Sequence, residues 1–306
     1  MHENGHVSSR FWMGWRLDHD KQINQDKPMY IKCWGARGSS PVSGKEFLKY
    51  GGNTSCLEIR VGNPEQIFII DLGSGALPLG RSLMESENIH IHALFTHTHW
   101  DHIMGFPLFP LVFVPESSIT FYYNPKFQGN PKKLIVQDMM AAPHFPVRID
   151  NLPVTIHYRQ IESQFQINEL KIKTIPLSHP NLGLGFRLEH QGKSFVFLTD
   201  NELGLKHNGG KSTDEYADFC RHADLLIHDS EYFTREEYSK HQGFGHSHAE
   251  QVIELALKAG VKSLGLFHHN RKRTDIQIDS FLKTISYNKT DNLNIFAVAQ
   301  GQEISL

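Results

Sequence analysis

Short apolar segments, separated by turns and amphipathic stretches, run through the chain from Tyr30 to its end. Such segments, about four to eight residues long and rich in β-branched and aromatic side chains, predict strands. The predicted strands cover residues 30–34, 55–61, 66–72, 90–95, 119–123, 154–159, 170–177, 185–189, 194–198, 225–228, 263–267 and 294–299.

Apolar residues at helical spacing predict helices over residues 77–85, 214–222, 248–259 and 276–287. Gly260 ends the third of these in the position where glycine commonly follows a helix. Ser247, with Glu250 three residues later, is suited to cap its start. Many strands with interspersed helices favour an α/β fold of two sheets covered by helices on the outside.

Two parts of the chain depart from this pattern. Residues 1–28 show no clear periodicity and predict an N-terminal arm, poorly ordered or loosely attached. The stretch 106–145 is rich in Phe, Tyr and Pro, so it is either a lid or dimer surface or simply a packed, elaborated loop. No linker interrupts residues 29–306, which we expect to form a single domain that carries this insertion.

Composition narrows the class of protein. Hydrophobic residues make up 39% of the 306 residues and charged residues 21%, as in a globular protein. The formal net charge of −2 does not indicate general electrostatic binding of nucleic acid, although a local basic patch remains compatible with it. No apolar run is long enough to span a membrane. The three cysteines form no CxxC pair, which fits a reduced, cytoplasmic location by default.

Histidine stands out, with twenty copies, and its spacing points to metal binding. The segment Thr96-His97-Thr98-His99-Trp100-Asp101-His102 contains H-x-H-x-D-H directly after an apolar strand. Strand alternation places His97 and His99 on one side, and a turn would bring Asp101 and His102 to a neighbouring position. One metal would take the first pair and a second metal the other. Imidazole and carboxylate ligands suit zinc, manganese or iron.

Further residues of ligand type follow later strands. His179, Asp200 and His268 each come just past the end of an apolar strand, where loops gather into a site. Each alone is a weak signal, but in this order after the histidine cluster they support a two-metal centre. His269 is adjacent to His268 and is the alternative ligand; we favour His268 because it immediately ends its strand.

With the preceding Asp71-Leu72-Gly73-Ser74-Gly75, these motifs resemble the metallo-β-lactamase superfamily over roughly residues 30–306. The resemblance implies an αββα sandwich with the site at one edge of two mixed sheets. It also implies two divalent ions, zinc above all, with manganese or iron as alternatives. By this resemblance His97, His99 and His179 hold the first metal, Asp101, His102 and His268 hold the second, and Asp200 bridges them.

Two later segments resemble the ribonuclease Z-like and cyclic phosphodiesterase branch: Ala223-Asp224-Leu225-Leu226-Ile227-His228-Asp229-Ser230 and Gly245-His246-Ser247-His248-Ala249-Glu250. The match implies that Asp229 orients His246, that His246 protonates the leaving alkoxide, and that Asp101 belongs to the catalytic group. A high-pKa leaving alcohol benefits from such an acid. The alternative for the pair is a supporting hydrogen bond or a helix cap.

The glycine-rich segments around Ser39 and Asn53 also resemble this branch. Their backbone N–H groups are able to approach a phosphate, so Ser39 and Asn53 are candidate substrate contacts, although such turns more often serve the fold alone.

The expected function is therefore a dinuclear phosphodiesterase. A metal-bridging hydroxide would attack a small diester, a cyclic nucleotide above all, with His246 as the acid. The alternatives are a hydrolase of carboxyl esters, thioesters or lactones and an RNA-processing endonuclease. Extended nucleic acid is less expected because no inserted Gly/Pro-rich arm is seen. The resemblance and the aromatic stretch 106–145 also suggest a homodimer.

Overall fold

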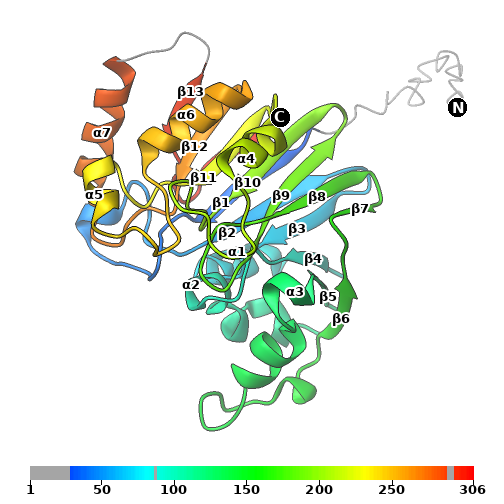
Figure 1. Cartoon of the computed structure of the whole chain (residues 1–306). Coiled ribbons are helices and arrows are strands. Elements are labelled where there is room, and N and C mark those ends of the chain that lie inside the picture. The colour runs from blue at the N-terminus through cyan, green and yellow to red at the C-terminus, as the bar shows by residue number, and fades with distance from the viewer. Residues whose placement is uncertain (1–27, 86–87, 288–292) are drawn as a thin grey trace, which may run out of the picture.

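The computed structural model describes residues 28–85, 88–287 and 293–306. Two seven-stranded sheets pack face to face, and helices cover the outer face of each (Figure 1). The predicted αββα architecture is thus confirmed. The predicted N-terminal arm lies outside the described residues, apart from Pro28.

The first sheet has the order β14-β1-β2-β3-β4-β5-β6. Its strands from β3 to β6 run parallel, and the others pair antiparallel. The bounds are β1 Tyr30–Gly35, β2 Cys56–Val61, β3 Gln66–Ile70, β4 His90–Leu94, β5 Ser118–Tyr123, β6 Thr155–Gln160 and β14 Glu303–Ser305.

The second sheet has the order β13-β12-β11-β10-β9-β8-β7. Strands β10 to β13 run parallel, so their carboxyl ends meet at the same edge. The bounds are β7 Gln164–Ile167, β8 Leu170–Pro176, β9 Leu184–His190, β10 Lys193–Leu198, β11 Leu225–Asp229, β12 Ser263–Phe267 and β13 Asn294–Ala297.

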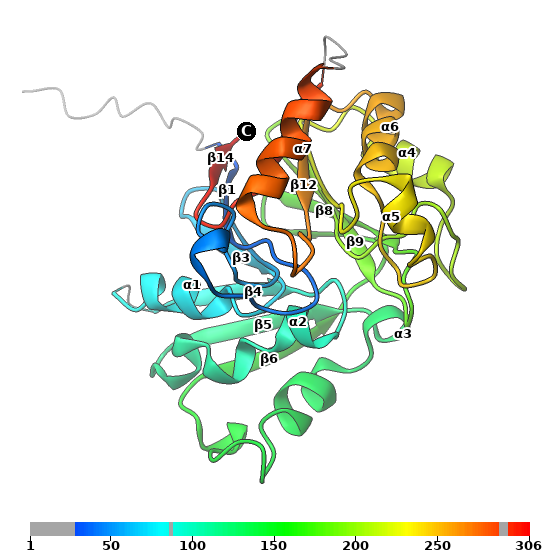
Figure 2. The ribbon, with the colours of Figure 1, turned by 90° about the vertical axis from the view of Figure 1, so that its left-hand side faces the viewer.

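The helices form the two outer layers. α1 (Ala76–Leu83) and the short α2 (Trp100–Ile103) and α3 (Pro125–Gln128) lie with the first sheet (Figure 2). α4 (Thr213–Cys220), α6 (Ala249–Ala259) and α7 (Asp275–Tyr287) lie with the second, and α5 (Arg235–Ser239) follows β11. Single turns of 3₁₀-helix occur at Lys45–Phe47, Phe106–Leu108, Pro110–Phe113 and Ile149–Asn151, and a π-helix at Lys132–Asp138.

Strand alternation explains why both sheets are covered on two sides. In β10, Phe195 and Phe197 point into the core between the sheets, whereas Val196 and Leu198 point outward to the layer of α4 and α6. All four side chains are buried, so the strand reads as a continuous apolar run. The inner core and two outer cores hold the sheet edges in place, and this fixes the loops that carry the site.

The aromatic stretch 106–145 packs largely onto the first sheet. Phe106, Phe109 and Phe121 are fully buried, and β5 pairs within the sheet. Leu108 and Phe113 remain exposed. Most of these aromatic residues therefore contribute to packing, and a lid or a dimer surface in this stretch stays a prediction.

The structure corrects several local expectations. Strands β7 and β14 were not predicted, because both are short and depend on pairing with β8 and β1. The predicted Ser247 cap of α6 is wrong: His248 is the N-cap residue, and the Ser247 hydroxyl donates to the Asn201 carbonyl instead. The three cysteines are buried and free, as expected. Among the described residues, no helix is long and apolar enough to cross a membrane.

Candidate metal centre

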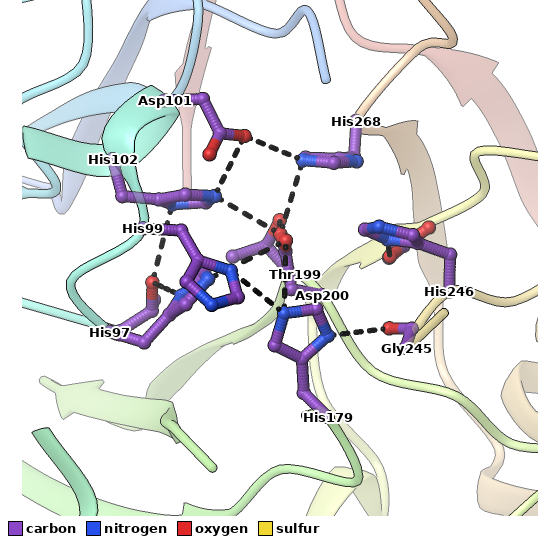
Figure 3. Close-up of polar contacts among 12 residues, drawn as sticks. His97, His99, Asp101, His102, His179, Thr199, Asp200, Gly245, His246 and His268 are labelled. Atoms are coloured by element: carbon purple, nitrogen blue, oxygen red, sulfur yellow. Dashed lines mark hydrogen bonds and ion pairs between the residues drawn. The ribbon is translucent and has the colours of Figure 1, made fainter. Parts of the chain in front are cut away.

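The histidine-rich segment lies where the ends of several strands meet. His97 and His99 follow β4, and the short helix α2 then carries Asp101 and His102 back toward the same point. From the second sheet come the residues that follow β8, β10 and β12: His179, Asp200 and His268. Figure 3 shows these seven side chains converging on one small space.

The first group of donors contains three imidazoles. Ligand atoms of His97, His99, His179 and Asp200 all lie within 4.8 Å of one another. The Nε2 of His179 is 3.1 Å from the Nδ1 of His99, and the Nε2 of His97 is 3.7 Å from the Oδ2 of Asp200. Three imidazoles with one carboxylate form a donor set that suits zinc, manganese or iron.

The second group shares Asp200 with the first. Asp101, His102, His268 and Asp200 again offer ligand atoms within 4.8 Å of one another. The Nε2 atoms of His102 and His268 each lie 3.2 Å from the Oδ1 of Asp200. Asp200 thus turns one carboxylate oxygen toward each group, an orientation suited to a residue shared by two cations.

Unsatisfied ring nitrogens test whether this centre fits metal ions. The Nε2 of His97 is buried and makes no hydrogen bond, although it faces Asp200. The Nε2 of His102 is also buried without a hydrogen bond, and it lies 3.2 Å from carboxylate oxygens of both Asp101 and Asp200. A buried polar atom without a hydrogen-bond partner is costly. The donor set and these two nitrogens fit divalent cations, with the seven residues above as the proposed ligands.

The charge balance differs between the two groups. Burial lowers the pKa of His97 well below its usual value, and it lowers the pKa of His179 to about 4 despite the attraction of Asp200. Neutral imidazole is the form that binds metal. Burial also lowers the pKa of His102 and His268, but nearby carboxylates, chiefly Asp101 and Asp200, outweigh it and raise both pKa values well above the usual range. A cation bound there would displace these protons.

The ring of His102 is anchored from its other nitrogen. Its Nδ1 lies 2.7 Å from the Oδ2 of Asp71, which follows β3. Asp71 also accepts hydrogen bonds from the backbone N–H and the hydroxyl of Thr96, at 2.8 and 3.0 Å. A carboxylate on the far nitrogen sets the tautomer and orientation of a ligand histidine. Asp71 therefore ties two strand ends to the centre.

His268 and His179 are anchored in the same way. The Nδ1 of His268 lies 3.2 Å from the Oε2 of Glu231, and that of His179 lies 3.0 Å from the carbonyl oxygen of Gly245. Sequence reasoning missed Glu231. Its only signal was its position two residues after Asp229, directly after the segment that ends at Ser230.

Left-handed backbone marks the strand ends that enter the centre. Asp71, Asp200 and His268 have φ values of 63°, 50° and 60°. Non-glycine residues adopt this region rarely, and when they do they cluster at functional sites. These turns stop β3, β10 and β12 and direct the side chains over the sheet edge.

The choice between the adjacent histidines follows from their surroundings. His268 joins the second donor group, whereas the Nε2 of His269 donates to the carbonyl of Val298 at 2.8 Å. Burial lowers the pKa of His269 to about 3, so it is a neutral core residue. The geometry favours His268, the residue preferred from the sequence, as the proposed ligand.

Gly38 touches the second donor group, and this contact gives a testable prediction. A Cβ at Gly38 would lie 2.5 Å from both the Nδ1 of His268 and the Oε2 of Glu231. Gly38→Ala is therefore expected to displace the His268 ring. The affinity for one of the two metal ions should fall about 10- to 100-fold, as it does when other contacts that orient a metal ligand are disturbed. Metal titration of the folded variant measures the loss.

Gly192→Ala serves as the comparison for Gly38→Ala. A Cβ at Gly192 would meet no atom within 4 Å, but the φ of this residue is 76°, so alanine there tests backbone strain alone. It should lower the melting temperature and leave the metal content unchanged. Two tightly bound metals in Gly38→Ala would contradict the contact.

Asp229 and His246 form a close pair beside the second group. The Nδ1 of His246 donates to the Oδ2 of Asp229 at 2.6 Å, and the His246 ring stacks on His268 with centroids 4.8 Å apart. Ligand-type atoms of Asp200, Asp229, His246 and His268 lie within 4.8 Å of one another. The predicted pair is thus brought together, and the ring lies next to the cations that the centre would hold.

Glu202 holds the loop that carries His246, and sequence reasoning missed it as well. Its buried carboxylate accepts from the backbone N–H groups of Gly243 and Gly245 at 2.8 Å, from the Tyr238 hydroxyl at 2.8 Å and from His207 at 2.7 Å. Because Gly245 also contacts His179, one carboxylate braces both the proposed acid and a proposed ligand. Its position two residues after Asp200 was the only sequence signal.

A cleft of about 760 Å³ opens from the centre, and Ser39, His99 and His246 line its inner end. The backbone N–H of Ser39 donates to Asp101 at 3.0 Å. Asn53 is not among the lining residues, and its side-chain oxygen accepts from the Ser74 hydroxyl. The structure therefore brings Ser39, but not Asn53, to the cleft.

Comparison with known proteins agrees with this arrangement. Residues 79–269 match the family described as a Beta-lactamase superfamily domain, which is more than half of the chain. The chain belongs to the metallo-β-lactamase superfamily. This chain is a superfamily hydrolase, and its family implies divalent metal ions.

Individual members of the superfamily are similar over most of their length. A protein named ribonuclease Z from Thermoplasma volcanium is 42% identical over 237 residues, covering 64% of this chain and 73% of that protein. Yeast PDE1 has a TM-score of 0.66 and 11% identity, covering 92% of this chain and 100% of PDE1. Human tRNase Z, short form, has a TM-score of 0.61 and 17% identity, covering 90% and 99%. At these identities the two structures support the fold alone.

Proposed function

We propose that this superfamily hydrolase cleaves phosphodiesters with a dinuclear metal centre and a histidine acid. The observation that carries the proposal is the 2.6 Å contact of His246 with Asp229 beside the second donor group. A thioester has no need of a carboxylate-held histidine at this place, because its thiolate leaves without protonation. An alkoxide leaving group does need an acid, because its conjugate alcohol has a high pKa. The 42% identity to a protein named ribonuclease Z favours a phosphodiester over a lactone or a lactam.

Asp200, Asp229 and His246 have different roles in the proposed reaction. Two divalent cations, when bound, lower the pKa of water and offset phosphate charge. Asp200, which belongs to both donor groups, would hold both cations. Asp229 occupies the Nδ1 of His246, which leaves the Nε2 as the proton donor to the leaving oxygen. After transfer His246 is neutral, and Asp229 keeps its ring in place for the next cycle.

The pH dependence of the reaction follows from this pair. Burial lowers the pKa of His246, but the charge of Asp229 and its hydrogen bond outweigh burial and raise that pKa to about 9. His246 acts as an acid only while it is protonated, so kcat/KM should fall as the pH rises through its pKa. Bound cations repel a protonated imidazole, so in the metal-loaded enzyme this pKa lies below the value of the metal-free site. Asp229→Asn removes the attraction, so the alkaline limb should move to lower pH.

The measurement is a pH profile of kcat/KM for the metal-loaded enzyme with a diester that releases a nucleoside alcohol. Asp224→Asn, which removes a carboxylate from the distant Lys262 ion pair, is the control and should leave the profile in place. An unchanged alkaline limb in Asp229→Asn would exclude His246 as the titrating acid.

A substrate panel tests the reaction class. Zinc- and manganese-loaded protein is expected to hydrolyse bis-p-nitrophenyl phosphate and cyclic nucleotides, and to lose this activity when a chelator removes the metal. Nitrocefin and thioesters should be poor substrates. Turnover of a thioester or lactam well above that of every diester would overturn the phosphodiesterase proposal.

A second candidate within the same reaction class is RNA processing. It is favoured by the 42% identity to a protein named ribonuclease Z. A precursor tRNA with a 3′ extension separates the candidates: cleavage at a single position near the mature 3′ end supports the endonuclease. Turnover of small diesters alone supports the cyclic-nucleotide enzyme expected from the sequence.

A further inference from the structure

A tight turn directly after the proposed ligand His268 faces the cleft. The backbone N–H of Arg273 donates to the carbonyl of Asn270 at 2.8 Å, and the Asn270 side chain accepts from the backbone N–H of Lys272 at 2.9 Å. The same side chain donates to Glu231 at 2.6 Å. The two central residues of this turn are Arg271 and Lys272.

A buried arginine stabilises this turn through hydrogen bonds to its backbone carbonyls. Arg37 is fully buried, and its Nη1 donates to the carbonyls of Asn270 and Arg273 at 3.2 and 2.9 Å. Its Nε and Nη2 donate to the carbonyl of Gly51 at 3.2 and 2.7 Å. Because both ends of the turn are fixed, Arg271 and Lys272 project from a rigid support.

The charged residues along the cleft leave the side chains of Arg271 and Lys272 free to bind an anion. Arg271 and Lys272 line the cleft and are exposed, and no carboxylate of the described residues forms an ion pair with them. The other charged residues that line the cleft have partners. Glu237 pairs with Arg273 at 2.7 Å, and Glu231 contacts His268 and Asn270. Lys240 pairs with Glu236, which does not line the cleft.

Aromatic rings lie at the same cleft. His241 stacks on Tyr232 at 5.0 Å, and the Phe244 ring, 64% exposed, meets His241 edge-on at 5.9 Å. All three residues line the cleft that His246 also reaches. Exposed aromatic faces accept stacked nucleobases of any sequence.

From this arrangement we infer that the substrate carries a second phosphate besides the scissile diester, and that Arg271 and Lys272 bind it. The inference rests on the proposed phosphodiesterase function and narrows its substrate. The substrate class is a nucleotide with at least two phosphates, such as a linear or cyclic dinucleotide. A cyclic mononucleotide has a single phosphate, which would bind at the metal centre. Arg271 and Lys272 would then have no phosphate to bind.

A pair of chromogenic substrates tests the inference. Thymidine 5′-(p-nitrophenyl phosphate) and its 3′-phosphorylated form share the scissile bond and leaving group and differ by one phosphate. For the metal-loaded wild-type enzyme, the added phosphate should raise kcat/KM about tenfold, as expected for two partly solvated ion pairs. Added salt should reduce this gain.

The double variant R271Q/K272Q should abolish the gain from the 3′-phosphate. The matched control K258Q/K262Q removes two exposed cations that pair with Asp214 and Asp224, and it should keep the gain. Equal kcat/KM for the two substrates, or a gain that survives in R271Q/K272Q, would overturn the inference. Failure of the wild-type enzyme to hydrolyse either substrate would instead overturn the proposed function.

Discussion

Replacing Asp200 with alanine is expected to abolish diester hydrolysis while the protein stays folded. Asp200 is 2% exposed and directs one oxygen toward each donor group. Without it, neither cation keeps its full set of ligands. Water that is not activated by metal keeps a pKa far above neutral pH instead of about 7, so we expect kcat to fall at least about 1000-fold.

Metal content and circular dichroism accompany the rate measurement. The bound metal of Asp200→Ala should fall from two ions per chain to below one, with an unchanged spectrum. Asp218→Ala removes an exposed carboxylate of α4 and is the control, with two metals and full activity expected. If Asp200→Ala kept both metals and a rate within tenfold of wild type, Asp200 would not bridge the centre.

Replacing His246 with alanine should produce a loss that depends on the leaving group. General acid catalysis contributes about 100- to 10,000-fold when the leaving oxygen is a strong base. For a diester that releases a nucleoside alcohol, we therefore expect a fall in kcat of that size. Bis-p-nitrophenyl phosphate releases the weakly basic nitrophenolate and should lose far less.

The comparison of the two leaving groups distinguishes an acid from a ligand. Loss of a metal ligand slows both substrates alike, whereas loss of the acid slows mainly the alkyl diester. His241→Ala removes a histidine of the same cleft that has no contact with Asp229, and it should show no such selectivity. If His246→Ala lost equal activity on both substrates, His246 would be a positioning residue and not the acid. The metal content of the variant would then show whether the displaced residue is the proposed ligand His268.

Much of the fold was predictable because its strands and helices are defined by local pattern. Both faces of β10 and β11 are buried, so their apolar runs stand out in the sequence. Strands β7 and β14 were not recognised, because Gln164–Ile167 and Glu303–Ser305 are short and become strands only when β8 and β1 pair with them. The capping role expected of Ser247 failed for a similar reason, since the tertiary contact with Asn201 takes its hydroxyl.

The sequence by itself determined the donor types of the centre, because H-x-H-x-D-H places four of them within a single strand end and turn. Only the tertiary structure decided their supports. Glu202 reaches the loop of Gly245 across 43 residues, Glu231 reaches His268 across 37, and Arg37 reaches Asn270 across 233. No local pattern encodes such contacts, because they arise when separate strands end at the same edge of the sandwich.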